Sequence, residues 1–132
     1  MEKWRRVWRD GLAPNLSRAA LLALQSALLT DDSRLVQGTL STPPPLDVLR
    51  PCAINGACAL GLCGWHGEGL NTIGQVEDYF DRACDAAAAA VDEPAACRHF
   101  LNWYDDAARD VMRRQLLAEV KLALQRKVPS AA

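Results

Sequence analysis

The sequence predicts an all-α fold, a compact single-domain bundle of five or six helices that includes residues 1–132. A chain of this length can bury one hydrophobic core. Half of the residues are hydrophobic, and alanine and leucine, which favour helices, outnumber the β-branched and aromatic residues typical of strands. The apolar residues recur mostly at the three- and four-residue spacing of amphipathic helices. No repeat of 20 to 50 residues indicates a solenoid.

Residues 1–15 form an aromatic and basic segment. Trp4, Val7 and Trp8 recur at helical spacing with arginines between them, which predicts a short amphipathic helix. Gly11 and Pro14 are expected to end it.

The next helix is predicted from Ser17, a suitable N-cap, to about Thr30. Leu21, Leu24 and Leu28 mark its apolar face.

Residues 39–51 are predicted to be a Pro-rich crossover between helices. Pro43, Pro44 and Pro45 fix the backbone and cannot donate hydrogen bonds, which is typical of an extended spacer. Since no PxxP motif with flanking basic residues is present, we expect a spacer rather than a ligand for an SH3-type domain.

Residues 52–63 are small and apolar almost all round, which predicts a buried helix. Gly64 is expected to terminate it. A Gly-rich loop should then extend over residues 64–69. This loop lacks the lysine and hydroxyl residue of a P-loop, so no nucleotide site is expected.

Thr72 and Gln75 form a capping-box pattern, which predicts a helix from Thr72 to about Val91. Asp92 or Glu93 is then expected to open a helix that has Pro94 in its first turn.

The final helix is predicted to begin at Asp105 or Asp106 and to end near Lys127. Its apolar stripe comprises Val111, Leu116, Val120 and Leu124. Arginines of this helix are expected on a solvated face, and residues 128–132 are expected to fray.

The charge balance and the cysteines limit the possible location and partners of the protein. Fifteen basic and sixteen acidic side chains give a net charge of −1, which provides no long-range attraction to nucleic acid or to an anionic membrane. No apolar run approaches the length of a spanning helix. The five cysteines lie among small residues, which indicates reduced, buried thiols and a cytoplasmic protein. They are Cys52, Cys58, Cys63, Cys84 and Cys97.

Several Cys, His and aromatic residues are candidate ligands for a metal or small molecule. Cys and His ligands would suit zinc, although no Cys-x2-Cys pair is present. The alternative is that the thiols are buried and the histidines lie at the surface. A cysteine nucleophile with a histidine base is formally available, but no local signature supports it, so we expect no enzyme activity and no cofactor. The candidates are Cys63, Trp65, His66, Glu68, Cys97, His99 and Trp103.

Trp4 and Trp8, with Arg5 and Arg9, are the candidate partner-binding residues. The indoles could pack on their own bundle, or they could be exposed and anchor a partner. In the second case Trp8→Ala should weaken association and leave the monomer folded.

The leading functional hypothesis is a small, non-catalytic protein-protein interaction or accessory module, which binds a protein partner or forms a homo-oligomer. The first alternative is a metal- or redox-dependent Cys/His protein, which would require the candidate ligands to converge. The second is a helical nucleic-acid-binding domain that uses arginines of the first and last helices. A cleft shared by Trp65, His66, His99 and Trp103 would favour an enzyme or ligand-binding protein.

Overall fold

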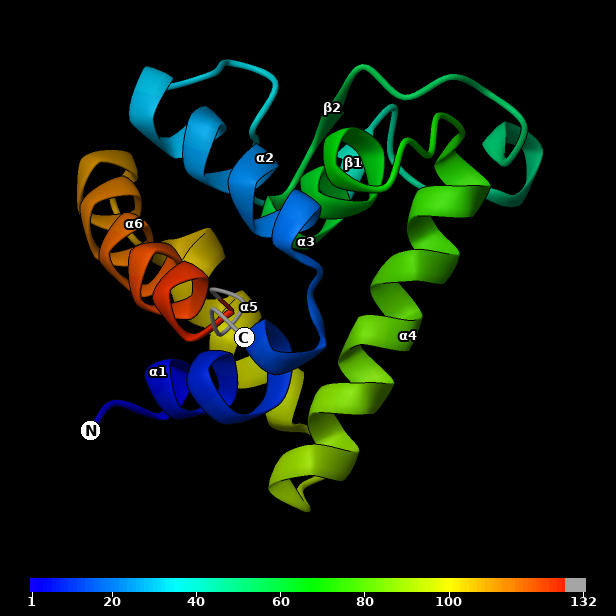
Figure 1. Ribbon diagram of the computed structural model, residues 1–132. Helices are drawn as coiled ribbons and strands as arrows, with labels where there is room; N and C mark the ends of the chain where they lie inside the picture. Colours follow the sequence, from blue (N-terminus) through cyan, green and yellow to red (C-terminus); the bar gives the residue numbers. More distant parts are fainter. Residues whose placement is uncertain (128–132) are drawn as a thin grey trace, which may run out of the picture.

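The computed structural model describes residues 1–127, apart from the side chain of Asp47. These residues form six α-helices and one two-stranded sheet (Figure 1). The predicted all-α class and the number of helices are confirmed. The expectation that residues 128–132 fray lies outside the described residues.

Helical backbone extends further at the N-terminus than the sequence predicts. The α-helix α1, Lys3–Val7, continues into the π-helix η1, Trp8–Leu12, and the 3-10 helix η2, Ala13–Asn15. Gly11 does not end the helix. A Cβ atom at Gly11 would lie 3.0 Å from the Cβ of Ala87, so this glycine permits a close approach to α4.

Helix α2, Arg18–Thr30, follows the prediction. The Ser17 Oγ accepts a hydrogen bond of 3.0 Å from the backbone N–H of Ala20. The helix ends at Asp31, which adopts a left-handed conformation with φ of 49°.

The prediction of a helix over residues 52–63 is wrong for most of its length. Strand β1, Ser41–Thr42, pairs antiparallel with strand β2, Gly56–Ala57. The N–H of Ala57 donates to Arg34 O at 2.8 Å, and the N–H of Cys58 donates to Leu40 O at 2.9 Å. The small side chains at residues 56–58 therefore allow a neighbouring backbone segment to approach closely. Hydrogen bonds to that segment satisfy the backbone polar groups of these residues without a helix.

Only helix α3, Ala59–Leu62, remains of the predicted helix, and the π-helix η4, Cys63–Gly67, continues from it. The expected Gly-rich loop is thus helical up to Gly67. Gly64 does not terminate a helix. A Cβ atom there would lie 2.9 Å from the Tyr79 ring, so Gly64 allows close packing on α4.

The capping box is confirmed at the start of helix α4, Ile73–Val91. The Gln75 N–H donates to Thr72 Oγ1 at 3.2 Å, and the Thr72 N–H donates to Gln75 Oε1 at 3.3 Å. The helix ends before Asp92, which has φ of 54°.

The last two helices begin later than predicted. Helix α5 is Ala96–Asp106, so Pro94 lies in the preceding turn. Helix α6 is Arg109–Arg126. Asp105 does not open α6, since α5 continues through Asp106, and the Asp105 Oδ1 accepts a hydrogen bond of 2.8 Å from the N–H of Gly38.

The core lies where the N-terminal helices meet the rest of the bundle. α2 packs on α6, α1 packs on α5, and η1 contacts both α4 and α6. Figure 1 shows α2 and α6 on one side of the molecule and α4 along the other. Trp8, Phe100 and Tyr104 are the largest fully buried side chains. Among the described helices, none is both long and apolar enough to cross a bilayer.

Candidate functional site

Trp4 and Trp8 are packed inside the protein, with exposed fractions of 4% and 0%. The Trp4 ring stacks on Trp103 with a centroid separation of 3.6 Å, and the Trp8 ring lies 5.6 Å from Phe100. The two indoles therefore pack on their own bundle, which is the first of the two alternatives. Neither indole is a surface anchor for a partner, because α5 covers the apolar face of α1.

Arg5 and Arg9, the other two candidates for partner binding, converge on Glu119 of α6. Arg9 Nε and Nη2 donate to the two carboxylate oxygens at 2.6 and 2.8 Å, and Arg5 Nη1 donates at 3.0 Å. The Glu119 side chain is only 2% exposed. The hydrogen bonds from Arg9 lower the pKa of Glu119, and Glu119 in turn raises the pKa of Arg9. We call these three residues the Glu119 cluster.

Sequence reasoning missed Glu119. The signal was present, since this acidic residue falls between Leu116 and Val120 on the apolar stripe of the last helix. A carboxylate on a buried face needs a cationic partner. The arginines between Trp4 and Trp8 could have been assigned that role.

A cavity of about 260 Å³ adjoins the Glu119 cluster, between η1–η2 and the C-terminal part of α6. Trp8, Arg9 and Pro14 line it from one side, and Leu122 and Arg126 line it from the other. The Trp8 Nε1 is a buried donor that finds no acceptor in the described part of the chain. The same residue thus lines the cavity and carries an unsatisfied polar atom.

Four of the candidate ligands lie in or beside η4. The Cys63 thiol is buried, contacts Ala20 O at 3.6 Å, and has its pKa raised by burial. Burial therefore favours the neutral thiol, which disfavours nucleophilic attack. Trp65 packs against the His66 ring at 4.1 Å, and burial lowers the pKa of His66. Glu68 accepts a hydrogen bond from Ser17.

The other three candidates are on α5 and have different neighbours. Cys97 helps to raise the pKa of the Cys84 thiol of α4, His99 Nε2 lies 2.8 Å from Glu93 Oε1, and Trp103 stacks on Trp4. η4 packs mainly on α2, α3 and α4, whereas α5 packs mainly on α1 and α4. The structure therefore does not bring the two sets together.

Within residues 1–127, no group of three or more His, Cys, Asp or Glu side chains is arranged to hold a metal ion. All five cysteines, each in the described part of the chain, are free thiols. Cys58, Cys63 and Cys97 are buried, and Cys52 and Cys84 are partly exposed.

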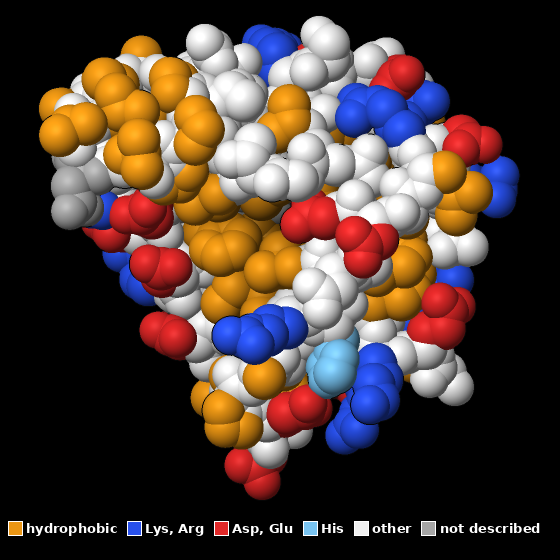
Figure 2. Space-filling model, turned by 180° about the vertical axis from the view of Figure 1, so that it is seen from behind, with side chains coloured by type: hydrophobic (Ala, Val, Ile, Leu, Met, Phe, Trp, Pro, Cys, Tyr) orange, Lys and Arg blue, Asp and Glu red, His pale blue; other side chains and the backbone are white. Residues whose placement is uncertain are grey.

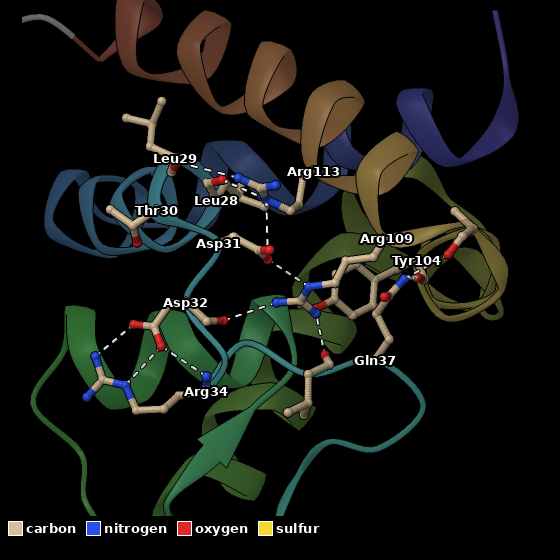
Figure 3. Close-up of polar contacts among 12 residues, drawn as sticks. Leu28, Leu29, Thr30, Asp31, Asp32, Arg34, Gln37, Tyr104, Arg109 and Arg113 are labelled. Atoms are coloured by element: carbon tan, nitrogen blue, oxygen red, sulfur yellow. Dashed lines mark hydrogen bonds and ion pairs between the residues drawn. The ribbon is translucent and has the colours of Figure 1, made fainter.

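A polar network joins the loop after α2 to the junction of α5 and α6 (Figure 3). Arg113 Nε donates to Leu28 O at 3.0 Å, and Arg109 Nε donates to Asp31 Oδ1 at 2.8 Å. The sequence suggested that the arginines of the last helix lie on a solvated face. Arg113 does not lie on such a face. It satisfies a carbonyl at the C-terminus of α2.

The same network fixes the course of residues 31–38. The Tyr104 hydroxyl donates to Val36 O at 2.7 Å, and Gln37 Nε2 donates to Tyr104 O at 2.7 Å. Arg34 lowers the pKa of Asp32 to about 2. These donors act on backbone carbonyls or on paired carboxylates, so the network holds the loop in place and offers no reactive group.

The Pro-rich segment presents the most exposed apolar side chains. We call residues 43–49 the apolar loop. Among residues 2–127, Leu46 and Val48 are the most exposed large hydrophobic residues, at 60% and 82%. Figure 2 shows a cluster of hydrophobic side chains at its upper left, where this loop projects from the bundle. The sequence assigned the segment to a spacer, and its exposed apolar surface was not foreseen.

Comparison with known proteins gives no match, since no protein-family model, curated protein or solved structure is similar to this chain.

Proposed function

We propose that this protein is a non-catalytic interaction module that binds another protein through the apolar loop. The observation that carries the proposal is the exposure of Leu46 and Val48, at 60% and 82%, on one projecting segment. Large aliphatic side chains that are exposed to water on one short segment are typical of a surface that a partner covers. Burying them on a partner contributes roughly 25 cal/mol per Å² of apolar area.

The ends of the apolar loop are tied to the bundle. Before the loop, Ser41 Oγ donates to Pro43 O at 2.7 Å, and the N–H of Asn55 donates to Thr42 O at 2.9 Å. After it, the N–H of Gly74 donates to Arg50 O at 2.9 Å. The Arg50 side chain reaches Glu77 and Asp78 of α4.

The interior of the loop is also restricted. The N–H of Leu49 donates to Leu46 O at 2.8 Å, and the three prolines limit the backbone. A segment held in this way loses little conformational entropy on binding, which favours affinity.

Charge next to the loop indicates the chemistry of the partner. Asp81 and Asp85 are four residues apart, so they lie on one face of α4, and both are exposed, whereas Asp78 beside them pairs with Arg50. Figure 2 shows acidic side chains along the edge of the molecule below the hydrophobic cluster. The complementary partner has an apolar groove bordered by lysine or arginine.

The remaining hypotheses have less support. Arg5 and Arg9 are occupied by Glu119, and Arg113 by a carbonyl of α2. These arginines are therefore not displayed for nucleic acid. The five free thiols are consistent with the reducing, cytoplasmic location that we also propose.

A photo-crosslinking amino acid at position 48, introduced into the full chain in cells, tests the proposal. Position 122 on α6 is the matched control, because Leu122 is also an exposed aliphatic residue. We expect a crosslinked adduct with another protein from position 48 and none with that protein from position 122. The identified partner, once purified, should bind the double variant Leu46→Asp, Val48→Asp about tenfold or more weakly than the wild type.

Two further results sharpen or refute the proposal. Charge reversal by Asp81→Lys with Asp85→Lys should weaken the same complex and reduce its sensitivity to salt. An adduct with a second copy of the chain, the lack of any adduct specific to position 48, or unchanged affinity of the Leu46, Val48 variant would each overturn the proposal.

A further inference from the structure

The cavity beside the Glu119 cluster combines apolar walls with an excess of positive charge. Trp8, Pro14 and Leu122 provide apolar surface. Arg126 and Lys127 add two cations at the end of α6, and Lys127 Nζ donates to Pro14 O at 3.1 Å across the rim.

The carboxylate in the cavity wall does not cancel this charge. Of the charged residues that line the cavity, Arg9, Arg126 and Lys127 are basic and only Glu119 is acidic, while Arg5, which also binds Glu119, pairs with Glu2. An anionic group that enters from the solvent therefore meets a net positive potential.

Trp8 provides a second, independent observation. Its Nε1 is the buried side-chain N or O atom for which the described residues provide no acceptor. Buried donors are almost always paired, and an orphaned one indicates an acceptor supplied by something else. Trp8, which carries this unpaired donor, is one of the residues that line the cavity.

From these observations we infer that the cavity binds a small organic carboxylate with a short apolar body. The carboxylate faces the Trp8 Nε1 donor and Arg126, and the short apolar body lies against Pro14 and Leu122. The volume of about 260 Å³ is below the usual range for drug-sized ligands, roughly 300 to 1,000 Å³, so the occupant is small. This site does not depend on the apolar loop or on any protein partner.

Titration of the ¹⁵N-labelled full chain with hexanoate tests the inference by NMR. We expect the Trp8 indole N–H resonance to move in a saturable way, with a dissociation constant on the order of 1 mM for so small a ligand. Hexanol, which has the apolar body alone, and acetate, which has the charge alone, should each bind more weakly than hexanoate.

Two arginine variants on one helix distinguish the site from general surface attraction. Arg126→Ala should weaken hexanoate binding by about three- to fivefold, as expected for one partly screened charge. Arg114→Ala removes the same charge from α6 but does not touch the cavity, so it should leave binding unchanged. Circular dichroism checks that both variants are folded.

The inference is overturned if hexanoate does not shift the Trp8 resonance, or if hexanol binds as well as hexanoate. Equal effects of Arg126→Ala and Arg114→Ala would also overturn it, since the anion would then respond to overall charge alone.

Discussion

The N-terminal aromatic segment and the apolar loop differ in the burial of their large apolar side chains. Trp4 and Trp8, flanked by arginines at the start of the chain, are buried. Leu46 and Val48, in a stretch of prolines, are exposed. From sequence, the first segment offered the better docking anchors and the second resembled a spacer.

The difference comes from what faces each segment. The first segment is helical, so its indoles lie on one side and meet the matching aromatic face of α5, where Trp103 and Phe100 stack on them. The loop has no such counterpart, and its prolines exclude it from a helix or a central strand. Burial is thus decided by a complementary surface elsewhere in the chain, and hydrophobic content alone does not predict it.

The strongest test of this contrast is Trp8→Ala. Because Trp8 is fully buried against Phe100, truncation should lower the free energy of unfolding by about 4 kcal/mol, measured by urea denaturation. This replaces the sequence-based expectation that the monomer tolerates the change. Val48→Ala, the control, should have an effect below about 0.5 kcal/mol. A loss under about 1 kcal/mol for Trp8→Ala would contradict the packing described for the indole.

The Glu119 cluster is the next test, because it shows that the arginines of the first segment also face inward. Glu119→Gln should lower the free energy of unfolding at pH 7 by about 2 kcal/mol, since two guanidinium groups lose a charged acceptor. Glu93→Gln breaks the exposed pair with His99 and should cost less than about 0.5 kcal/mol.

The difference in stability between the wild type and Glu119→Gln should depend on pH in a defined way. The pKa of Glu119 is lowered in the folded protein from its ordinary value of 4.5, so its charge stabilises the fold above about pH 4.5. That contribution is lost as the pH falls through the folded pKa. The difference in stability between wild type and Glu119→Gln should therefore narrow below about pH 4.5, and a difference that is constant with pH would argue against a charged Glu119.

The long helices were predictable because their signals are local. Ser17 caps α2, and Thr72 and Gln75 cap α4, as the sequence indicated. Capping and amphipathic spacing depend on residues a few positions apart, which a single sequence displays. α5 continues through Asp106, so α6 begins later than predicted, and Asp105 instead bonds to the N–H of Gly38, a contact between distant segments.

The backbone contacts that residues 31–58 make with one another were not predictable for the same reason. Their backbone groups bond across the chain, as Ala57 does to Arg34 and Cys58 does to Leu40. The candidate site shows a similar division. The Trp and Arg pattern at the N-terminus identified residues that do cluster, but Glu119, which organises them, is 110 positions away from Arg9.

A smaller effect is expected from Arg50→Gln, which tests whether the apolar loop is held in place. The loss of the contacts to Glu77 and Asp78 should speed hydrogen exchange of peptides that include residues 43–52, while the global unfolding transition stays unchanged. Arg34→Gln, which breaks a comparable pair with Asp32, should leave exchange in this loop as it was. Unaltered exchange after Arg50→Gln would mean that the backbone contacts alone hold the loop.

Little or no effect on stability is expected from Val48→Asp, and this result separates the two regions most clearly. A side chain that is 82% exposed loses almost no contacts when replaced, so the free energy of unfolding should change by less than about 0.5 kcal/mol. The same charge at the fully buried Val76 should prevent folding, because the burial of an unpaired carboxylate is very costly. A large destabilisation by Val48→Asp, measured by urea denaturation of the isolated protein, would show that this residue belongs to the core, and the loop would then have no surface to offer a partner.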